Sequence, residues 1–368
     1  MHTQTGVIRN ITAFAAAFVA ALIFLGCAGA PEPLEDGAEL SPEAEELVYE
    51  GIRRHDRGDY KTALDYYRRA LELSPDAPVI YYEMGFSYLY MENPEKTLEV
   101  SEAGIVKAER AVKNRDTANK IGNAEHIKVL TGLYELKGSA LDNLGRREEA
   151  AAVYLETIER FGVSDTSLLY YNLGVTYFRM GKRAEARESL AKGLLINPFH
   201  PGSNYLLGRI CFEENRKTQS LYSLCYFLIL EPDTERSGEA DALIKELLAY
   251  KESIGFSDTG AFAGADLIIS LSFAAGEDKK TEAERFEAKL RYIFSALEEQ
   301  KNNGNIERTN GDELWWDFYV PLFYQMSQSE YMEAFCRYIS QSGSAESRNW
   351  LKAHNGEVEA LFAWLNGR

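Results

Sequence analysis

Side chains that could carry out catalysis are few in this sequence. It contains five histidines and four cysteines in 368 residues, and none stands at a spacing typical of a zinc site. Phosphate-binding glycine loops, nucleophile elbows and HExxH motifs are absent from it as well. We expect the internal histidines to be solvated or hydrogen-bonded structural residues: His55, His126, His200 and His354. The sequence therefore predicts no enzyme activity, no metal site and no cofactor.

Aromatic side chains gather toward the end of the chain, where a binding role is conceivable. The densest group is Trp315, Trp316, Phe318, Tyr319, Phe323 and Tyr324. Aromatic rings stack on sugars, so this group could bind a glycan or line a ligand pocket. Their spacing of three and four residues is also that of a buried helix face. We favour the second interpretation, a helical core.

The elements that position these residues follow a repeat of 34 residues. The first copy has Gly51, Gly58, Ala63, Tyr67, Ala70 and Pro75. The second has Gly174, Gly181, Ala186, Leu190, Gly193 and Pro198, and the third has Gly208, Asn215, Ser220, Leu224, Phe227 and Pro232. Small residues at fixed offsets let two helices approach closely, and a proline ends the second helix at a constant place.

This pattern resembles the tetratricopeptide repeat (TPR) family, with repeats starting at residues 44, 78, 131, 167 and 201. The resemblance implies an all-α fold: a right-handed superhelix, or α-solenoid, of about five helical hairpins. Each hairpin would bury its apolar face only by stacking on its neighbours. Such repeats build surfaces that bind other proteins and rarely perform chemistry.

The family's concave groove is lined by the first helix of each repeat. Carried onto this chain, the groove positions are Tyr82, Phe86, Tyr90, Tyr171, Phe178, Arg179, Tyr205, Arg209 and Phe212. Aromatic and arginine side chains are the types that dominate protein-binding sites. Some of them could instead pack between helices. Repeats that clamp a terminal carboxylate carry Lys and Asn where this chain has Val48, Ile52 and Glu83, so that clamp is not expected.

The N-terminus reads as a targeting segment. Arg9 precedes an apolar stretch from residue 11 to residue 25, and Gly26-Cys27-Ala28 follows. This resembles a bacterial lipoprotein signal, which implies cleavage before Cys27 and lipidation of its thiol; Phe24 and Leu25 depart from the family's preferred residues. An uncleaved membrane helix over residues 11–30 or ordinary secretion remain the alternatives.

Composition limits the partners. The chain has 40 basic and 57 acidic residues and a net charge of −17, which disfavours broad nucleic-acid binding. Three cysteines besides Cys27 are expected to be buried and reduced, although a disulfide between Cys211 and Cys225 is conceivable.

The predicted organisation has six parts. They are a signal peptide (1–26), the lipidated cysteine with a flexible acidic, proline-containing linker (27–43), repeats one and two (44–111), an insertion (112–130), repeats three to five (131–234) and a helical, aromatic-rich domain or cap (235–368). The insertion could be a helix extension or a surface loop. In the last part we expect helices over residues 239–251, 281–301, 312–326, 329–339 and 346–365, and a short one within 253–278.

The sequence favours a non-catalytic scaffold or assembly factor at the bacterial envelope. It would be an outer-membrane lipoprotein facing the periplasm, held on the membrane by its lipid anchor. It would bind a helix or peptide of an envelope protein in the repeat groove, and would not bind nucleic acid. The alternative is an envelope enzyme or glycan-binding protein whose active part is residues 235–368.

Overall fold

The computed structural model describes residues 40–114, 120–162, 166–249, 262, 266–269, 272, 278–279, 281–302 and 312–367. Cys27, the apolar N-terminal segment and nearly all of the expected linker lie outside these residues, as does most of 253–278. Every regular element in the described part is a helix, which confirms the all-α fold class. None of the helices there is long and apolar enough to cross a membrane.

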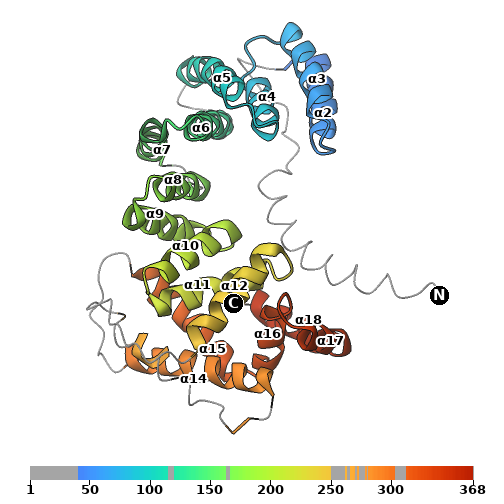
Figure 1. The fold of residues 1–368 in the computed structure, drawn as a ribbon. Coiled ribbons are helices and arrows are strands. Elements are labelled where there is room, and N and C mark those ends of the chain that lie inside the picture. Colours follow the sequence, from blue (N-terminus) through green and yellow to red (C-terminus); the bar gives the residue numbers. More distant parts are fainter. Residues whose placement is uncertain are drawn as a thin grey trace, which may run out of the picture. The chain divides into compact units, whose positions relative to one another are not determined.

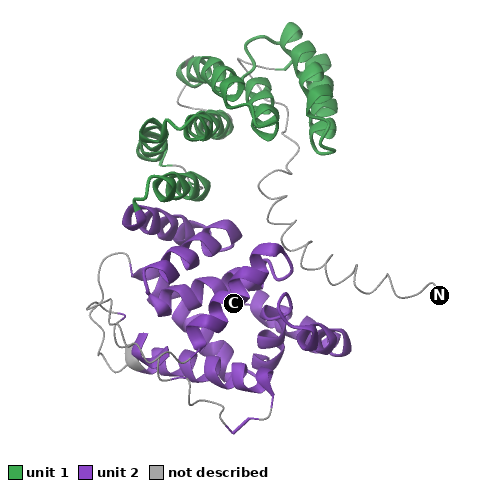
Figure 2. Ribbon diagram, viewed as in Figure 1, with its two compact units in different colours: residues 1–182 green, residues 183–368 purple. Residues whose placement is uncertain are grey.

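The chain divides into two units, residues 1–182 and 183–368, coloured separately in Figure 2. The helices of unit 1 are α2 (Pro42–His55), α3 (Tyr60–Leu73), α4 (Pro78–Tyr90), α5 (Pro94–Asn114), α6 (Lys120–Asn143), α7 (Arg147–Phe161) and α8 (Ser167–Arg179). Those of unit 2 are α9 (Arg183–Ile196), α10 (Pro201–Glu213), α11 (Lys217–Leu230), α12 (Glu235–Leu248), α14 (Glu282–Asn302), η2 (Leu314–Tyr319), α15 (Val320–Gln328), α16 (Met332–Ile339), α17 (Ala345–Ala353) and α18 (Asn355–Asn366).

Local sequence signals set the helix ends. Ser41 caps α2 by accepting a hydrogen bond from the backbone of Ala44, and Pro42 takes the first helical position. Gly58 adopts a φ of 77° in the turn that leads to α3, a conformation that favours glycine. The expected proline stops are confirmed. Helices α3, α9 and α11 each end shortly before Pro75, Pro198 and Pro232.

Glycines let the two helices of a repeat pack closely. A Cβ atom added at Gly51 would overlap the ring of Tyr67, and one added at Gly138 would overlap that of Tyr154. Both tyrosines are completely buried. Large aromatic side chains on the second helix therefore fill the space that glycine leaves on the first.

The expected insertion is occupied largely by helix. Helix α5 continues to Asn114 and α6 already begins at Lys120, while residues 115–119 lie outside the described part. Both helices are consequently longer than those of the other repeats, and they pack extensively on each other.

Unit 2 is organised around α11, the second helix of repeat five (Figure 1). Nearly all of its residues from Thr218 to Leu230 are buried. It contacts α10, α12, α16 and η2, and the ring of Tyr222 packs against Phe294 of α14 and Phe323 of α15. The helical block after residue 234 therefore closes around the last repeat.

The prediction of one helix in this block is wrong. Instead of a single helix over residues 346–365, the structure has α17 and α18, separated at His354. The imidazole Nδ1 of His354 is 2.8 Å from the carbonyl oxygen of Trp350, and its ring stacks on the Trp350 indole. This side chain satisfies the end of α17 and marks the break.

Candidate functional site

The first predicted groove residues form an aromatic cluster on α4. Phe86 lies between Tyr82 and Tyr90, with ring centroids 6.0 and 5.1 Å away. These residues are four apart along the helix and therefore share one face. His55 at the end of α2 stacks on Phe86 at 5.2 Å, and Tyr60 of α3 lies 5.7 Å from Tyr90. Three helices thus contribute to what we call the α4 cluster: His55, Tyr60, Tyr82, Phe86 and Tyr90.

Members of the α4 cluster differ in their accessibility. A Cβ atom added at Gly132 of α6 would lie 2.6 Å from the ring of Tyr82, so Tyr82 packs against the next repeat. Tyr90 is 54% exposed, one of the most exposed large side chains in the described residues. The cluster therefore has a packed end at Tyr82 and an accessible end at Tyr90.

The carboxylate of Glu83 lies beside the α4 cluster. Glu83 is half-buried on α4, and the described residues place no basic group at ion-pair distance from it. Burial and the nearby charge of Asp56 raise the pKa of Glu83 to about 7. His55, whose Nδ1 is 2.8 Å from the Oγ of Ser87, has its pKa lowered by burial. Near neutral pH the His55 imidazole therefore carries little positive charge. A cationic group of a bound partner would stabilise the ionised carboxylate of Glu83.

The groove residues on α8 take part in the packing of unit 1. Tyr171 and Phe178 are half-buried. Arg179 forms an ion pair with Asp142 of α6, whose side chain is buried, and Arg147 of α7 lies 3.7 Å from the other oxygen of the same carboxylate. A buried carboxylate requires such partners, so Arg179 has a structural role whatever else it binds.

The groove residues on α10 lie among other side chains of unit 2. Tyr205 is buried, its hydroxyl donates a hydrogen bond to Glu239 of α12, and its ring lies 5.0 Å from that of Phe227. The guanidinium of Arg209 lies 5.6 Å from the centre of the Tyr205 ring. Phe212 is half-buried. Tyr205 therefore packs between helices more than it faces a groove.

The aromatic group at residues 315–324 is a core, as its spacing predicted. Trp315, Trp316, Tyr319 and Phe323 are all buried, so their faces are not available for stacking on a sugar. The Tyr319 hydroxyl donates a hydrogen bond to the buried amide oxygen of Asn204 at the start of α10. This block is thereby joined to repeat five by a polar contact as well as by packing.

The cysteines are also accounted for. Cys211, Cys225 and Cys336 are free and buried, which confirms the interpretation as small apolar core residues. Burial raises the pKa of all three thiols, so they remain protonated at neutral pH.

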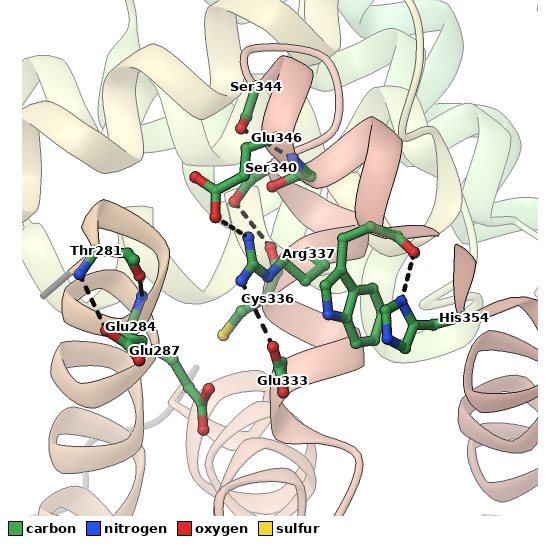
Figure 3. Close-up of polar contacts among 12 residues, drawn as sticks. Thr281, Glu284, Glu287, Glu333, Cys336, Arg337, Ser340, Ser344, Glu346 and His354 are labelled. Atoms are coloured by element: carbon green, nitrogen blue, oxygen red, sulfur yellow. Dashed lines mark hydrogen bonds and ion pairs between the residues drawn. The ribbon is translucent and has the colours of Figure 1, made fainter. Parts of the chain in front are cut away.

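A pocket that the sequence did not reveal lies in unit 2, between α12, α14, α16 and α17. Its volume is about 260 Å³. The walls carry four basic side chains: Lys245, Arg285, Lys289 and Arg337. Figure 3 shows Arg337 between the carboxylates of Glu346 and Glu333. The lining residues are spread from 245 to 347 without a motif, and only the packing of four helices brings them together.

Comparison with known proteins identifies the repeats. Models of the tetratricopeptide repeat match residues 131–160 and 167–200, and a TPR repeat model matches residues 51–91. The chain therefore contains tetratricopeptide repeats, in the places where the residue pattern predicted repeats one, three and four. A search of curated proteins gave no match.

Several solved structures are similar. A thermophilic TPR protein of Thermus thermophilus is 19% identical over 55% of this chain and 99% of its own, with a TM-score of 0.42. PilF of Pseudomonas aeruginosa is 16% identical over 78% and 97%, with a TM-score of 0.40. PilW, a type IV pilus biogenesis factor, is 12% identical over 63% and 91%, with a TM-score of 0.45.

Proposed function

We propose that this protein is a non-catalytic scaffold of the bacterial envelope that binds a partner protein through its tetratricopeptide repeats. The observation that carries the proposal is the α4 cluster: a set of contacting rings, open at Tyr90, beside the carboxylate of Glu83, with which no basic group in the described part of the chain pairs. Exposed aromatic side chains are frequent anchors of protein interfaces. A helix or peptide that offers an apolar and a basic side chain would satisfy both features.

Tyr90→Ala tests this site in the full-length chain. If Tyr90 is an anchor, its truncation should weaken capture of an envelope partner by about 30-fold, the effect of losing roughly 2 kcal/mol at a binding hot spot. Tyr292→Ala is the matched control, because Tyr292 is also exposed but lies on α14. Equal capture by wild type and both variants would rule out the α4 cluster.

The position in the envelope forms a second part of the proposal. The resemblance of residues 1–28 to a lipoprotein signal supports an anchor on Cys27, with export to the outer membrane and the repeats in the periplasm. Mass spectrometry of the mature N-terminus tests this directly. A lipid-modified Cys27 is expected, whereas an intact Met1 would indicate an uncleaved membrane helix.

A further inference from the structure

The pocket of unit 2 gathers basic side chains in an acidic chain. Its walls hold four basic side chains and two acidic ones, Glu282 and Glu346, in a protein with a net charge of −17. Two further carboxylates, Asp241 and Glu333, pair with Lys245 and Arg337 from outside the lining. The question for ligand binding is therefore which of the basic groups still lacks a carboxylate.

The basic groups are only partly neutralised by the protein. Lys245 pairs with the buried Asp241 at 2.9 Å. Lys289 donates a hydrogen bond of 3.0 Å to the carbonyl oxygen of Leu248, a neutral acceptor, and no carboxylate of the described residues pairs with it. Burial and the charge of Arg285 lower the pKa of Lys289. The negative charge of an anion in the pocket would offset both effects, because it favours the protonated amine of Lys289.

Arg337 shows how such an anion would be held. Its side chain is only 10% exposed, yet its guanidinium binds the far more exposed Glu346 carboxylate at 2.7 Å and reaches Glu333 at 3.5 Å. Figure 3 shows these two acids approaching the guanidinium along different directions. A planar guanidinium holds carboxylates and phosphates through paired hydrogen bonds. Glu346 therefore occupies a position that a ligand oxyanion could take.

The surrounding backbone adds to the attraction. Helices α14 and α17 both begin at the pocket, where Glu282 and Ala283 open the first and Ser344 caps the second. Helix N-termini carry partial positive charge. The thiol of Cys336 in the wall is uncharged, since burial raises its pKa, and so it does not oppose an anion.

The rest of the wall limits the size and character of the ligand. Leu248, Ala249, Ala283 and Phe286 form an apolar side. The volume of about 260 Å³ lies just below the range of roughly 300–1,000 Å³ that is usual for small-molecule sites. We propose that this pocket binds a small organic oxyanion, with the carboxylate or phosphate group at Lys289 and Arg337 and a short apolar part against Phe286.

Ligand-observed NMR on the full-length protein, at constant ionic strength, tests the proposal with three probes. Butyrate represents the carboxylate, inorganic phosphate the phosphate group, and butyramide is the neutral analogue of butyrate. We expect at least one of the two anions to bind with a dissociation constant of about 1 mM or tighter, and butyramide to bind at least tenfold more weakly. The anion that binds identifies the acid group. Failure of both anions, or equal binding of butyramide, would overturn the proposal.

Variants locate the bound anion. Lys289→Met keeps the aliphatic stem, removes the charge and should weaken binding at least tenfold. Lys352→Met removes the same charge from the exposed end of α17, outside the pocket, and should leave binding unchanged. Equal losses in both variants would show a general charge effect and would refute the site.

Glu346→Gln gives a test in the opposite direction. It removes the internal carboxylate that competes for Arg337, so the bound anion should bind at least threefold more tightly. A damaged fold cannot imitate that gain, and the test therefore holds even if Lys289→Met fails to fold. If the affinity for the anion stays the same or falls in Glu346→Gln, the anion does not bind at Arg337 in competition with Glu346, and the proposed site is excluded.

Discussion

Substitution of Gly208 by alanine tests whether close helix approach in the repeats depends on glycine. A Cβ atom at this position of α10 would lie 2.7 Å from the Cγ and Cδ2 atoms of Leu224 and 3.3 Å from its backbone nitrogen. Leu224 belongs to α11 and is completely buried, so its side chain cannot turn out into solvent. The carbonyl of Gly208 also accepts a hydrogen bond of 2.9 Å from the Oγ of Ser220, which ties the two helices together.

The size of the effect follows from two opposing contributions. Overpacking of a filled core costs about 1–3 kcal/mol, whereas alanine is favoured over glycine inside a helix by up to about 1 kcal/mol. Gly208→Ala should therefore lower the free energy of unfolding by about 0–3 kcal/mol. Gly238 on α12 is the matched control, because nothing lies within 4 Å of a Cβ atom added there. Gly238→Ala should be more stable than wild type by about 0.5–1 kcal/mol.

Urea unfolding followed by tryptophan fluorescence suits this comparison. All four tryptophans, at positions 315, 316, 350 and 364, belong to unit 2, as do both glycines. The propensity contribution cancels between the two variants, so their difference, about 1–3 kcal/mol, measures the steric contact alone. Equal stabilisation by both substitutions would refute the close-contact reasoning.

Three further predictions concern polar groups. Glu83→Gln should stabilise the fold by about 1–3 kcal/mol above pH 7 and have little effect below about pH 4. The raised pKa of Glu83 means that ionising this carboxyl costs more free energy in the folded state than in the unfolded chain. Urea titrations by circular dichroism at the two pH values check this, and a pH-independent gain would contradict it. Arg179→Met should lower the free energy of unfolding by about 1–2 kcal/mol, because it leaves the buried Asp142 carboxylate with one distant partner, Arg147. Adding Asp142→Asn should recover much of that loss in the same assay. Tyr319→Phe should lower the free energy of unfolding by about 1–2 kcal/mol, since the buried oxygen of Asn204 loses its hydrogen-bond donor. Urea unfolding followed by tryptophan fluorescence checks this, and an unchanged stability would show that the hydrogen bond is not stabilising.

Sequence predicted the repeats well because their signals are local. The glycine that meets Tyr67 and the proline that follows α3 act within one hairpin, at offsets that the chain itself displays. The core character of Trp316 and Phe323 could likewise be inferred from helical spacing. The break at His354 was not predicted, although Asn355 and Gly356, a pair typical of turns, follow it directly.

The sites were less predictable because they depend on contacts between distant segments. Family positions selected residues on α4 and on α10 alike, but nothing in the sequence distinguished Tyr90, which is exposed, from Tyr205, which is buried against α12. The pocket in unit 2 requires four helices, and its basic residues lie far apart in an acidic chain. Only tertiary packing gives Lys289 and Arg337 a common environment.

The burial of α11 on all sides sets a limit on how the repeat array can change. A tetratricopeptide array normally gains or loses whole repeats at an end that is covered by a single capping helix. Here the last repeat supplies the centre of another helical assembly, so a sixth repeat after residue 234 would have to displace α12, α16 and η2. A repeat could therefore be added after α11 only if the helices that cover α11 were rearranged.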